Sequence, residues 1–502
     1  MRKQNSPLFV ILGLVACLTP LSTRTQAAAA RDYRPLAREI FRELIEIKTT
    51  DSGVGSTPAA EAVAQRLRAA GFPEADIQVI GPSARKKNVV ARLHGSGKAK
   101  PILIFGHLDV VEAPKEDWSP DLDPFKFVER DGYFYGRGTQ DMKGAAAIVV
   151  TNFIRWNQEG WVPARDLVLA LTADEELYGD EDGVDWLLKN HRDVIDAEYS
   201  LNSDGGDFQT RDRKPYSIAV AAGEKKETIL QLVTHNRGGH GSQPRKDNAI
   251  YQLNAALDRI AKLRFPVVLN DVTHAQFDAL SALESGQVAA DMKAVSRDPP
   301  DAAAVERLSE DPYYNALLRT TCVATMLEAG HGPSALPQRA KAVINCRIAP
   351  GHTSAEMLQT LRGAIADDGV EIAWQFNEPS DPPASPLRPD VFAAVRKATD
   401  RMWQGVVLMP GMETGMTDAR FLRAAGIPSY GVSGTFLEQG DGRAHGKDER
   451  IRVDDFYAGV EFYDRFMKAL AGGYAHQARA ISRLNGAPRA IRTPDLQIRS
   501  LF

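Results

Sequence analysis

Basic residues are not in excess in this sequence, and no stripe of them stands out. The 502 residues include 61 lysines and arginines against 65 acids, which gives a net charge of −4. This balance argues against nucleic acid as a partner. The chain is 43% hydrophobic and 25% charged, as globular proteins are. Its length exceeds what one hydrophobic core can organise, so we expect two or more domains.

Long apolar runs are also missing. The most apolar stretch near the N-terminus, PLFVILGLVACL, is too short to span a membrane comfortably, so we expect no integral membrane span. Arg2 and Lys3 precede it and the small-residue stretch TQAAAA follows it, which is the pattern of a secretory signal peptide. We predict a signal peptide over residues 1–30 and an exported, periplasmic or secreted protein. The stretch LVAC also resembles a bacterial lipobox, so lipoprotein anchoring at Cys17 is the alternative.

Cysteine is scarce, with three in the whole chain. Removal of the signal peptide would leave Cys322 and Cys346, which allow at most one disulfide within a chain. Both lie in strand-like runs, TTCVATML and AVINCRI, on either side of a loop with glycine and proline. In an antiparallel pair the two could face each other and bond, but two buried free thiols fit the pattern equally well.

Strand-like and helix-like segments alternate in the first part of the chain. Apolar residues at helical spacing mark PLAREIFRELIEI, PAAEAVAQRLRAAG and GAAAIVVTNFIRW. Apolar runs typical of strands are NVVARLHG, PILIFGHLDVV, DLVLALTADEE and AEYSLNSD. This alternation predicts an α/β fold, in which helices flank a mostly parallel mixed sheet.

The pattern changes after about residue 222. A strand leads into a helix over 247–263 with Asp247 as its N-cap, and a polar, acid-rich segment covers 285–312. Thr353 and Glu356 form a capping box that opens another helix. We expect a smaller α+β domain inserted into the first one. A proline-rich linker, NEPSDPPASPLRPD, leads back to the alternating pattern.

These patterns divide the chain into five segments. They are a signal peptide over 1–30, the first part of the main domain over 31–222, the inserted domain over 223–378, the second part of the main domain over 379–471, and a tail over 472–502. The tail has no clear periodicity, and we expect it to be disordered or a spurious extension of the reading frame.

One predicted strand ends in three acids. The apolar run LVLALTA leads directly into Asp174, Glu175 and Glu176. Adjacent side chains on an extended segment point to opposite sides, so one glutamate can bind a cation while its neighbour faces a different object. A dication would also reduce the repulsion between the carboxylates.

Other acids and histidines follow strand-like runs or lie in glycine-rich loops. They are His107 and Asp109 in GHLDV, Asp141 in GRGTQDMKG, Asp204 in NSDGG and His445 in AHGKDE. An aspartate in a loop is usually a turn or capping residue when it stands alone. Together, hard carboxylates and imidazoles suit zinc, or less often cobalt or manganese, and ligands gather at strand ends in open α/β folds.

These motifs together resemble the M20 family of zinc exopeptidases and amidohydrolases over about residues 34–471. The family includes carboxypeptidases, aminoacylases and deacylases. The resemblance implies a zinc-exopeptidase-like fold with an inserted lid or dimerisation domain, and a centre of two Zn²⁺ ions, for which Co²⁺ or Mn²⁺ could substitute. The implied metal ligands are Asp141 as the bridge, His107 and Asp204 on one ion, and Glu176 and His445 on the other.

The resemblance also implies catalytic roles. Glu175 would be the general base and acid for a water activated by the two metals, and Asp109 would orient the imidazole of His107. His240, in GGHGSQP, would support the oxyanion, and in dimeric relatives this histidine comes from the partner subunit. A loop-capping role is the structural alternative for His240.

Substrate contacts are implied at three further residues. Arg347, in NCRIAPG, would bind a substrate carboxylate, although a surface salt bridge is the alternative. Gly415 and Thr417, in GMETGMTDAR, would line the substrate site. Where relatives often carry Asn before ALP, this chain has Ser334, whose shorter side chain puts a substrate contact there in doubt.

The leading hypothesis is a secreted metallo-carboxypeptidase that hydrolyses the amide bond next to a free C-terminal carboxylate in short peptides. An N-acyl-amino-acid amidohydrolase, meaning an aminoacylase or deacylase, is the alternative, because both activities need the same metals and a carboxylate anchor. A periplasmic zinc-binding protein without catalysis is the third hypothesis, and Glu175 argues against it. The partners we expect are a short peptide or N-acyl amino acid and, through the inserted domain, a second copy of the chain.

Overall fold

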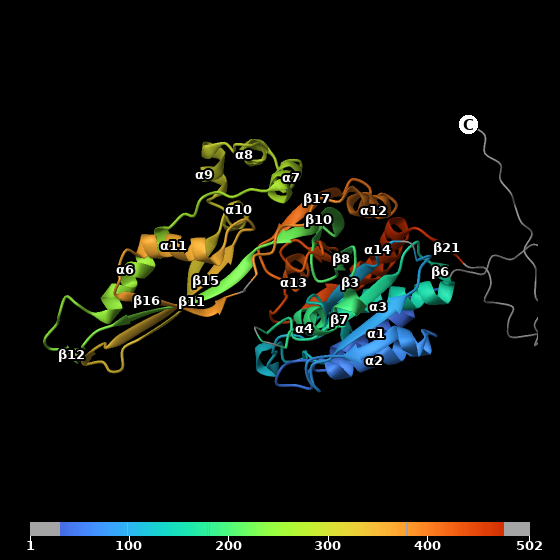
Figure 1. Ribbon diagram of the computed structural model, residues 1–502, viewed down its shortest axis with the longest axis horizontal. Coiled ribbons are helices and arrows are strands. Elements are labelled where there is room, and N and C mark those ends of the chain that lie inside the picture. Colours follow the sequence, from blue (N-terminus) through green and yellow to red (C-terminus); the bar gives the residue numbers. More distant parts are fainter. Residues whose placement is uncertain (1–30, 98, 178, 180, 378–379, 476–502) are drawn as a thin grey trace, which may run out of the picture.

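The computed structural model describes residues 31–97, 99–177, 179, 181–377 and 380–475, which form two lobes (Figure 1). The predicted signal peptide and Cys17 lie outside these residues, as does most of the predicted tail. In the part of the chain that is described, no helix has the length and apolar character needed to cross a membrane.

A ten-stranded mixed sheet forms the centre of the main lobe, in the order β1-β2-β7-β3-β8-β18-β10-β9-β19, with β17 paired to β10. Strands β7, β3, β8 and β18 run parallel to one another. Strand β2 is antiparallel to β7, and β1 is antiparallel to β2. The strands are β1 (Ile77–Ile80), β2 (Asn88–Leu93), β3 (Ile102–His107), β7 (Leu167–Thr172), β8 (Tyr199–Asn202), β9 (Asp207–Arg211), β10 (Lys214–Glu224), β17 (Val407–Glu413), β18 (Ser429–Gly431) and β19 (Phe436–Glu438).

Helices cover both faces of this sheet, as the sequence predicts. On one face lie α1 (Arg34–Glu46), α2 (Thr57–Ala69), α3 (Lys143–Glu159), α12 (Pro389–Asp400) and α14 (Val453–Ala471), and on the other lie α4 (Gly183–Asn190), α5 (Arg192–Ile195) and α13 (Ala419–Ala424). Residues 102–105 of β3 are all apolar because both faces of this strand are buried. Ile102 and Ile104 belong to the core under α1 and α3, whereas Leu103 and Phe105 belong to the core on the other face, under α4 and α13.

Short elements complete the main lobe. They are β4 (Val128–Arg130), β5 (Tyr133–Tyr135) and β20 (Arg450–Arg452) in one small sheet, β6 (Trp161–Val162) paired with β21 (Tyr474–Ala475), and the 3₁₀ helices η1 (Glu74–Asp76) and η2 (Lys115–Asp117). The pairing of β21 with β6 lies within the first residues of the predicted tail.

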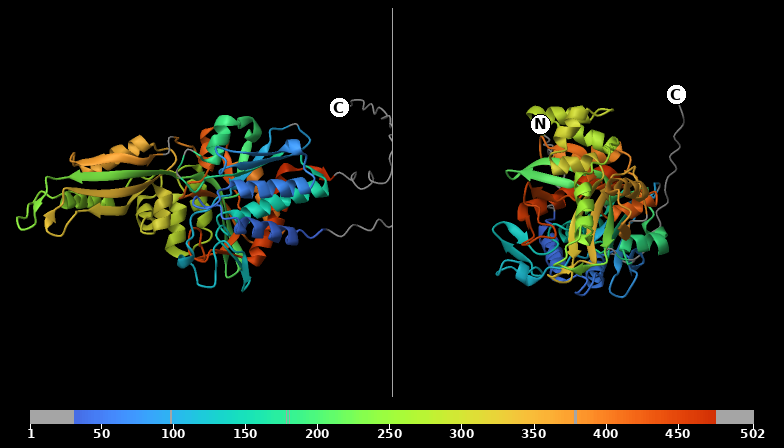
Figure 2. Two further views of the ribbon diagram at one scale, coloured as in Figure 1. Left: turned by 90° about the horizontal axis from the view of Figure 1, so that it is seen from below. Right: turned by 90° about the vertical axis from the view of Figure 1, so that its left-hand side faces the viewer.

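The second lobe is built on an antiparallel sheet in the order β13-β15-β11-β16. Its strands are β11 (Lys226–His235), β13 (Thr321–Ala329), β15 (Arg339–Ile348) and β16 (Val370–Asn377), and its helices α6 (Ala249–Lys262) and α11 (Ser354–Ile365) cover one face. Figure 2 shows from a second direction that this sheet projects away from the main lobe. Only Lys225 separates β10 from β11, so one nearly continuous strand joins the lobes.

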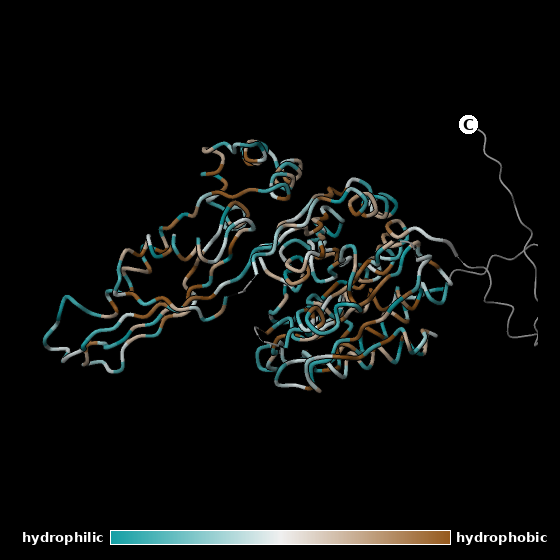
Figure 3. Tube along the Cα trace, in the orientation of Figure 1, coloured by the Kyte–Doolittle hydropathy of each residue, from teal (hydrophilic) through white to brown (hydrophobic). Residues whose placement is uncertain are grey.

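The outer end of the second lobe carries a short pairing of β12 (Gly239–His240) with β14 (Ala335–Leu336). This end is largely hydrophilic, whereas apolar segments concentrate in the sheet and helices of the main lobe (Figure 3). The two helix caps predicted in this lobe differ in outcome. Thr353 and Glu356 form the predicted capping box, but Asn248 rather than Asp247 caps α6, because its side chain reaches the Ile250 amide.

The segment 285–312, predicted only as polar and acid-rich, contains the helices α8 (Gly286–Val295) and α9 (Ala302–Leu308). The helix α7 (Asp271–Leu280) precedes this segment, and α10 (Pro312–Leu318) begins at its last residue. Phe277 and Met292 are buried in the same core as the main sheet, and α7 packs against β17. Scattered apolar residues on short helices give a weak periodic signal, so the acids dominated the sequence pattern.

Cys322 and Cys346 are directly opposite in the β13–β15 ladder and form a disulfide, with Cα atoms 4.1 Å apart. Register therefore decides between the two alternatives that the sequence left open. The bond links β13, an edge strand of the second sheet, to its neighbour β15.

Candidate metal centre

Five candidate ligands stand at the ends of neighbouring elements. His107 is the last residue of β3, while Glu176 follows β7 and Asp204 follows β8. Because these three strands are adjacent and parallel, their carboxyl ends share one edge of the sheet. Asp141 precedes α3, and His445 lies in the loop before β20. Residues from distant parts of the sequence therefore meet at that edge.

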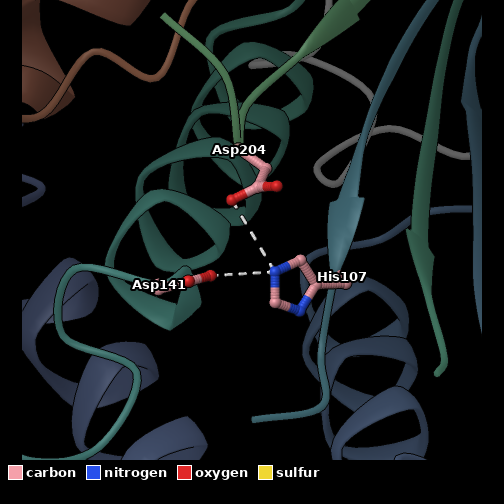
Figure 4. A group of neighbouring side chains, drawn as sticks. All are labelled: His107, Asp141 and Asp204. Carbon is pink, nitrogen blue, oxygen red and sulfur yellow. Dashed lines mark hydrogen bonds and ion pairs between the residues drawn. The ribbon is translucent and has the colours of Figure 1, made fainter. Parts of the chain in front are cut away.

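The first group is centred on the buried imidazole of His107 (Figure 4). Its Nε2 atom lies 3.0 Å from Oδ1 of Asp141 and 3.7 Å from Oδ1 of Asp204. The other ring nitrogen, Nδ1, lies 3.1 Å from the carbonyl oxygen of Asp109 and 3.7 Å from its carboxylate. A hydrogen bond from Nδ1 to Asp109 leaves Nε2 with a lone pair for a cation.

The second group is centred on His445, whose imidazole is half exposed. Its Nε2 atom lies 3.0 Å from Oδ2 of Asp141 and 2.9 Å from Oε2 of Glu176. Asp141 thus belongs to both groups, and it presents a different carboxylate oxygen to each. A carboxylate placed in this way can bridge two cations.

The donor atoms fit metal ions in number, type and spacing. Within each group of three, the ligand atoms lie within 4.8 Å of one another. Two ligands of a tetrahedral zinc, each about 2.1 Å from the ion, lie roughly 3–3.5 Å apart, which resembles the observed separations. Hydrogen bonds to Asp141 and Glu176 raise the pKa of His445 to about 10, so these carboxylates strongly favour a positive charge at this position.

Glu175 belongs to neither group. Burial raises the pKa of its carboxyl well above the usual range, with the negative charges of Asp204 and Glu176 adding to the effect and His107 opposing it. Its neighbour Glu176 lies 2.9 Å from Nε2 of His445 and belongs to the second group. The carboxyl of Glu175 is therefore protonated more readily than the carboxyl of an exposed glutamate.

Asp109 has a wider set of contacts than the sequence indicated. Besides its contact with His107, its carboxylate accepts hydrogen bonds from the backbone amides of Glu175, at 3.3 Å, and Glu176, at 3.0 Å. One carboxylate therefore ties the end of β3 to the turn that carries both glutamates.

Glu449 is a supporting residue that the sequence analysis missed. It is fully buried, and its carboxylate accepts hydrogen bonds from the amides of Gly138, Gln140 and Asp141 and from the guanidinium of Arg137. These contacts fix the loop that carries the shared aspartate. The sequence signal for it is that Glu449 is the last residue of the AHGKDE motif, which also contains His445.

The two candidates on the second lobe lie in different surroundings. His240 lies exposed in β12 at the far end of the lobe, where its Nδ1 atom is 2.7 Å from the Ser242 hydroxyl (Figure 1). The Ser334 carbonyl accepts a hydrogen bond from Gly241 beside it. Arg347, in β15, forms an ion pair of 2.8 Å with the buried carboxylate of Glu227.

The loop predicted to line the substrate site has a direct connection to the first group. The Thr417 hydroxyl accepts a hydrogen bond from the side chain of Asn202, and the Asn202 carboxamide oxygen accepts one from the amide of Asp204. Thr417 also donates from its amide and hydroxyl to the buried carboxylate of Glu224. Gly415 is exposed, with open space where a side chain would be.

The central strands of the main sheet are parallel, and acids and histidines gather at their carboxyl ends. This combination of fold and site is that of a metallohydrolase. Comparison with known proteins makes the assignment specific: a model of the family described as peptidase family M20/M25/M40 matches residues 103–469. The chain belongs to this family, and it is a hydrolase of amide bonds.

Similar proteins of known name cover most of the chain. The human N-fatty-acyl-amino acid synthase/hydrolase PM20D1 is 27% identical, over 72% of this chain and 72% of its own length. A probable carboxypeptidase S-like protein of Dictyostelium discoideum is 27% identical, over 74% of this chain and 71% of its own. Mouse aminoacylase-1 is 26% identical, over 86% and 94%.

Solved structures agree on the fold. An M20 family metallo-carboxypeptidase from Sulfolobus solfataricus superposes with a TM-score of 0.66 at 17% identity, covering 87% of this chain and 99% of that one. The YXEP protein of Bacillus subtilis, a dinuclear metal binding peptidase of the M20 family, gives a TM-score of 0.53 at 11% identity and covers 88% and 99%.

Proposed function

We propose that this protein is an exported, zinc-dependent metallo-carboxypeptidase that hydrolyses the amide bond next to a free C-terminal carboxylate in short peptides. The observation that carries the proposal is the arrangement of Asp141, which offers one oxygen to the group of His107 and the other to the group of His445. A shared carboxylate between two sets of ligands is what a dinuclear hydrolase needs.

Each ion would have its own ligand set. His107, Asp141 and Asp204 would hold one ion, and Asp141, Glu176 and His445 would hold the other. Zinc suits a mixture of imidazole and carboxylate ligands, and cobalt or manganese could replace it. When bound, such dications polarise a scissile carbonyl and lower the pKa of water.

Glu175 would move the protons. It would accept one from the attacking water at its carboxylate and later donate it to the nitrogen of the leaving amine. Its raised pKa suits both tasks, because a carboxyl that titrates closer to neutral pH can hold a proton between the two transfers. Asp109 would orient His107 from one side and the glutamate turn from the other.

The second lobe would recognise the substrate. The side chain of Arg347 is 30% exposed and its guanidinium is paired with Glu227, so a substrate carboxylate would bind at the exposed part of this side chain. Gly415 and Thr417 would line the same site. His240 would support the oxyanion, and because it lies at the far end of its own chain, a homodimer would have to supply it from the second copy.

An N-acyl-amino-acid amidohydrolase is the second candidate. The specific observation in its favour is the similarity to proteins named N-fatty-acyl-amino acid synthase/hydrolase and aminoacylase. Both candidate activities cleave an amide next to a free carboxylate, so both would use the same metals and Arg347.

Hydrolysis of a small substrate panel tests the proposal. The purified protein, loaded with zinc, is assayed on dipeptides, N-acetyl and N-fatty-acyl amino acids, and the same compounds with an amidated carboxyl group. The carboxypeptidase proposal expects the highest kcat/KM on dipeptides with a free carboxylate. Higher values on N-acyl amino acids would select the second candidate, and no hydrolysis of any compound would contradict both.

A further inference from the structure

The turn after β7 carries the proposed general base in an unusual backbone conformation. Asp174, immediately before the two glutamates, has a φ angle of +68° and is 4% exposed. Aspartate adopts this left-handed region more readily than most residues, but other contacts usually maintain it. Here the reversal directs the amides of Glu175 and Glu176 toward the carboxylate of Asp109.

A buried asparagine forms hydrogen bonds to both ends of the segment that contains this turn. The Asn88 side chain accepts a hydrogen bond from the amide of Ala173, at 2.9 Å, and donates one to the carbonyl of Gly183, at 3.4 Å. The amide of Gly183 bonds in turn to the carbonyl of Ala173, at 2.8 Å. A Cβ at Gly183 would lie 2.2 Å from the Asn88 oxygen, so this contact requires glycine.

A lysine two residues before Asn88 holds the same segment by charge. The Lys86 ammonium lies 2.7 Å from the carboxylate of Asp174 and 3.2 Å from that of Glu181, with Asp51 at 3.6 Å. The ion pair to Asp174 is largely shielded from solvent, whereas Glu181 is partly exposed. Screening by salt therefore weakens the Asp174 contact least.

We propose that Lys86 and Asn88 form a clip that positions Glu175 and Glu176, with Lys86 as a positioning residue for turnover. Asn88 fixes where the segment leaves β7, and Lys86 fixes the left-handed conformation of Asp174. The clip acts through the backbone and touches neither substrate nor metal. This inference rests on the proposed function of Glu175, and its structural part can be tested separately.

The surroundings of the turn explain why a charge is needed there. A cavity of about 40 Å³ lies among residues that include Lys86, Asp109, Asp174 and Glu176. Apolar packing therefore does not fill the space behind the turn, and the backbone could relax into it if the ion pair were lost. A displacement of the order of 1 Å at a catalytic group can lower turnover by about 100-fold.

Three variants test the clip. Lys86→Met removes the charge and retains most of the side-chain volume, and Lys86→Arg retains the charge. Lys87→Met is the matched control, because Lys87 forms no ion pair among the residues that the structure describes. Steady-state kinetics on the best substrate and hydrogen–deuterium exchange of metal-free protein, read on peptides covering 170–177, give two independent measurements.

We expect Lys86→Met to lower kcat by about 10- to 100-fold with KM changed by less than about three-fold, and to speed exchange in the 170–177 peptides while β3 stays protected. Lys86→Arg should restore most of both properties, and Lys87→Met should match the parent. Unchanged exchange in Lys86→Met, or a Lys86→Arg variant as impaired as Lys86→Met, would overturn the clip. Full activity of Glu175→Gln would instead overturn the proposed function, while the exchange result would still report on the clip.

Discussion

The two lobes differ in how closely the fold groups their candidate residues. At the edge of the main sheet, acids and histidines from separate segments form two groups in which the ligand atoms lie within 4.8 Å of one another. Glu449 and Asp109 bind the backbone amides of residues in these groups. On the second lobe, His240 is exposed and remote, and Arg347 is paired with Glu227. A site on parallel strand ends is assembled by the fold itself, whereas a site on a projecting sheet depends on where that sheet sits.

The segment that joins the lobes reinforces this difference. Four consecutive charged residues, Glu224 to Glu227, are all buried, and each contacts a different element. Their main partners are Arg423 for Glu224, the carbonyls of Ala316 and Arg319 for Lys225, Asp381 for Lys226, and Arg347 for Glu227. Glu224 is thereby fixed within the main lobe and Glu227 within the second lobe, and loss of either arginine would leave an uncompensated buried charge.

The largest expected effect concerns the residue that unites the two ligand groups. Asp141→Ala should abolish activity and lower bound zinc from two ions per chain toward zero, because neither group keeps three ligands and the ions lose their shared anion. Metal analysis and the turnover rate measure this, with wild-type protein treated in parallel. Two zinc ions retained by the variant would contradict the bridging assignment.

The adjacent glutamates provide an internal comparison within the main lobe. Glu175→Gln should keep zinc but lose turnover by about 10²- to 10⁴-fold, because the amide cannot accept a proton. Glu176→Gln should weaken zinc binding first, because it removes an anionic ligand. Zinc stoichiometry and kcat are measured for both variants. Loss of zinc by Glu175→Gln with retention of zinc by Glu176→Gln would reverse the two roles.

A change confined to the second lobe should leave the metal centre intact. Replacing both Cys322 and Cys346 with alanine should lower the free energy of unfolding of that lobe by about 2–4 kcal/mol, because the disulfide restricts the unfolded chain. Denaturant titration measures the loss, and zinc stoichiometry serves as the control. Loss of zinc in the folded variant would show that the lobes are more tightly coupled than their separate cores suggest.

Arg347→Ala should affect only substrates with a free α-carboxylate. Loss of a charge-assisted contact should cost about 1.5–3 kcal/mol in kcat/KM for these substrates. Their amidated counterparts are the control and should react at an unchanged rate. Equal losses on both kinds of substrate would assign Arg347 a structural role through Glu227.

Mixing two impaired variants tests whether the second lobe acts on a partner. Glu175→Gln lacks the proton carrier, and His240→Ala lacks the proposed oxyanion donor. If His240 acts across a dimer, a mixed dimer has one intact site, and an equal mixture after subunit exchange should regain roughly a quarter of wild-type activity. Native mass spectrometry, which resolves the mixed dimer from the two homodimers by mass, confirms that exchange has occurred. An exchanged mixture no more active than its components would contradict the action of His240 across a dimer.

The sequence predicted the parts of the main lobe that follow from local patterns. Apolar runs marked β3, β7 and β8, and an acid or histidine at the end of each run marked the site. This inference needed only one rule, that adjacent parallel strands end at the same edge of a sheet. The resemblance to the M20 family supplied the roles, which remain predictions for His107, Asp141, Asp204 and the other ligands.

The tertiary structure decided what depends on contacts between distant segments. Sequence spacing could not show that Cys322 faces Cys346, that Glu449 holds the loop of Asp141, or that Lys86 reaches Asp174, because each contact depends on register or on loops that meet only in the fold. It also could not place His240, whose motif is local but whose distance from the metal centre is set by the projecting second sheet. Periodicity records which face of an element is buried, whereas the partner on that face is chosen by topology.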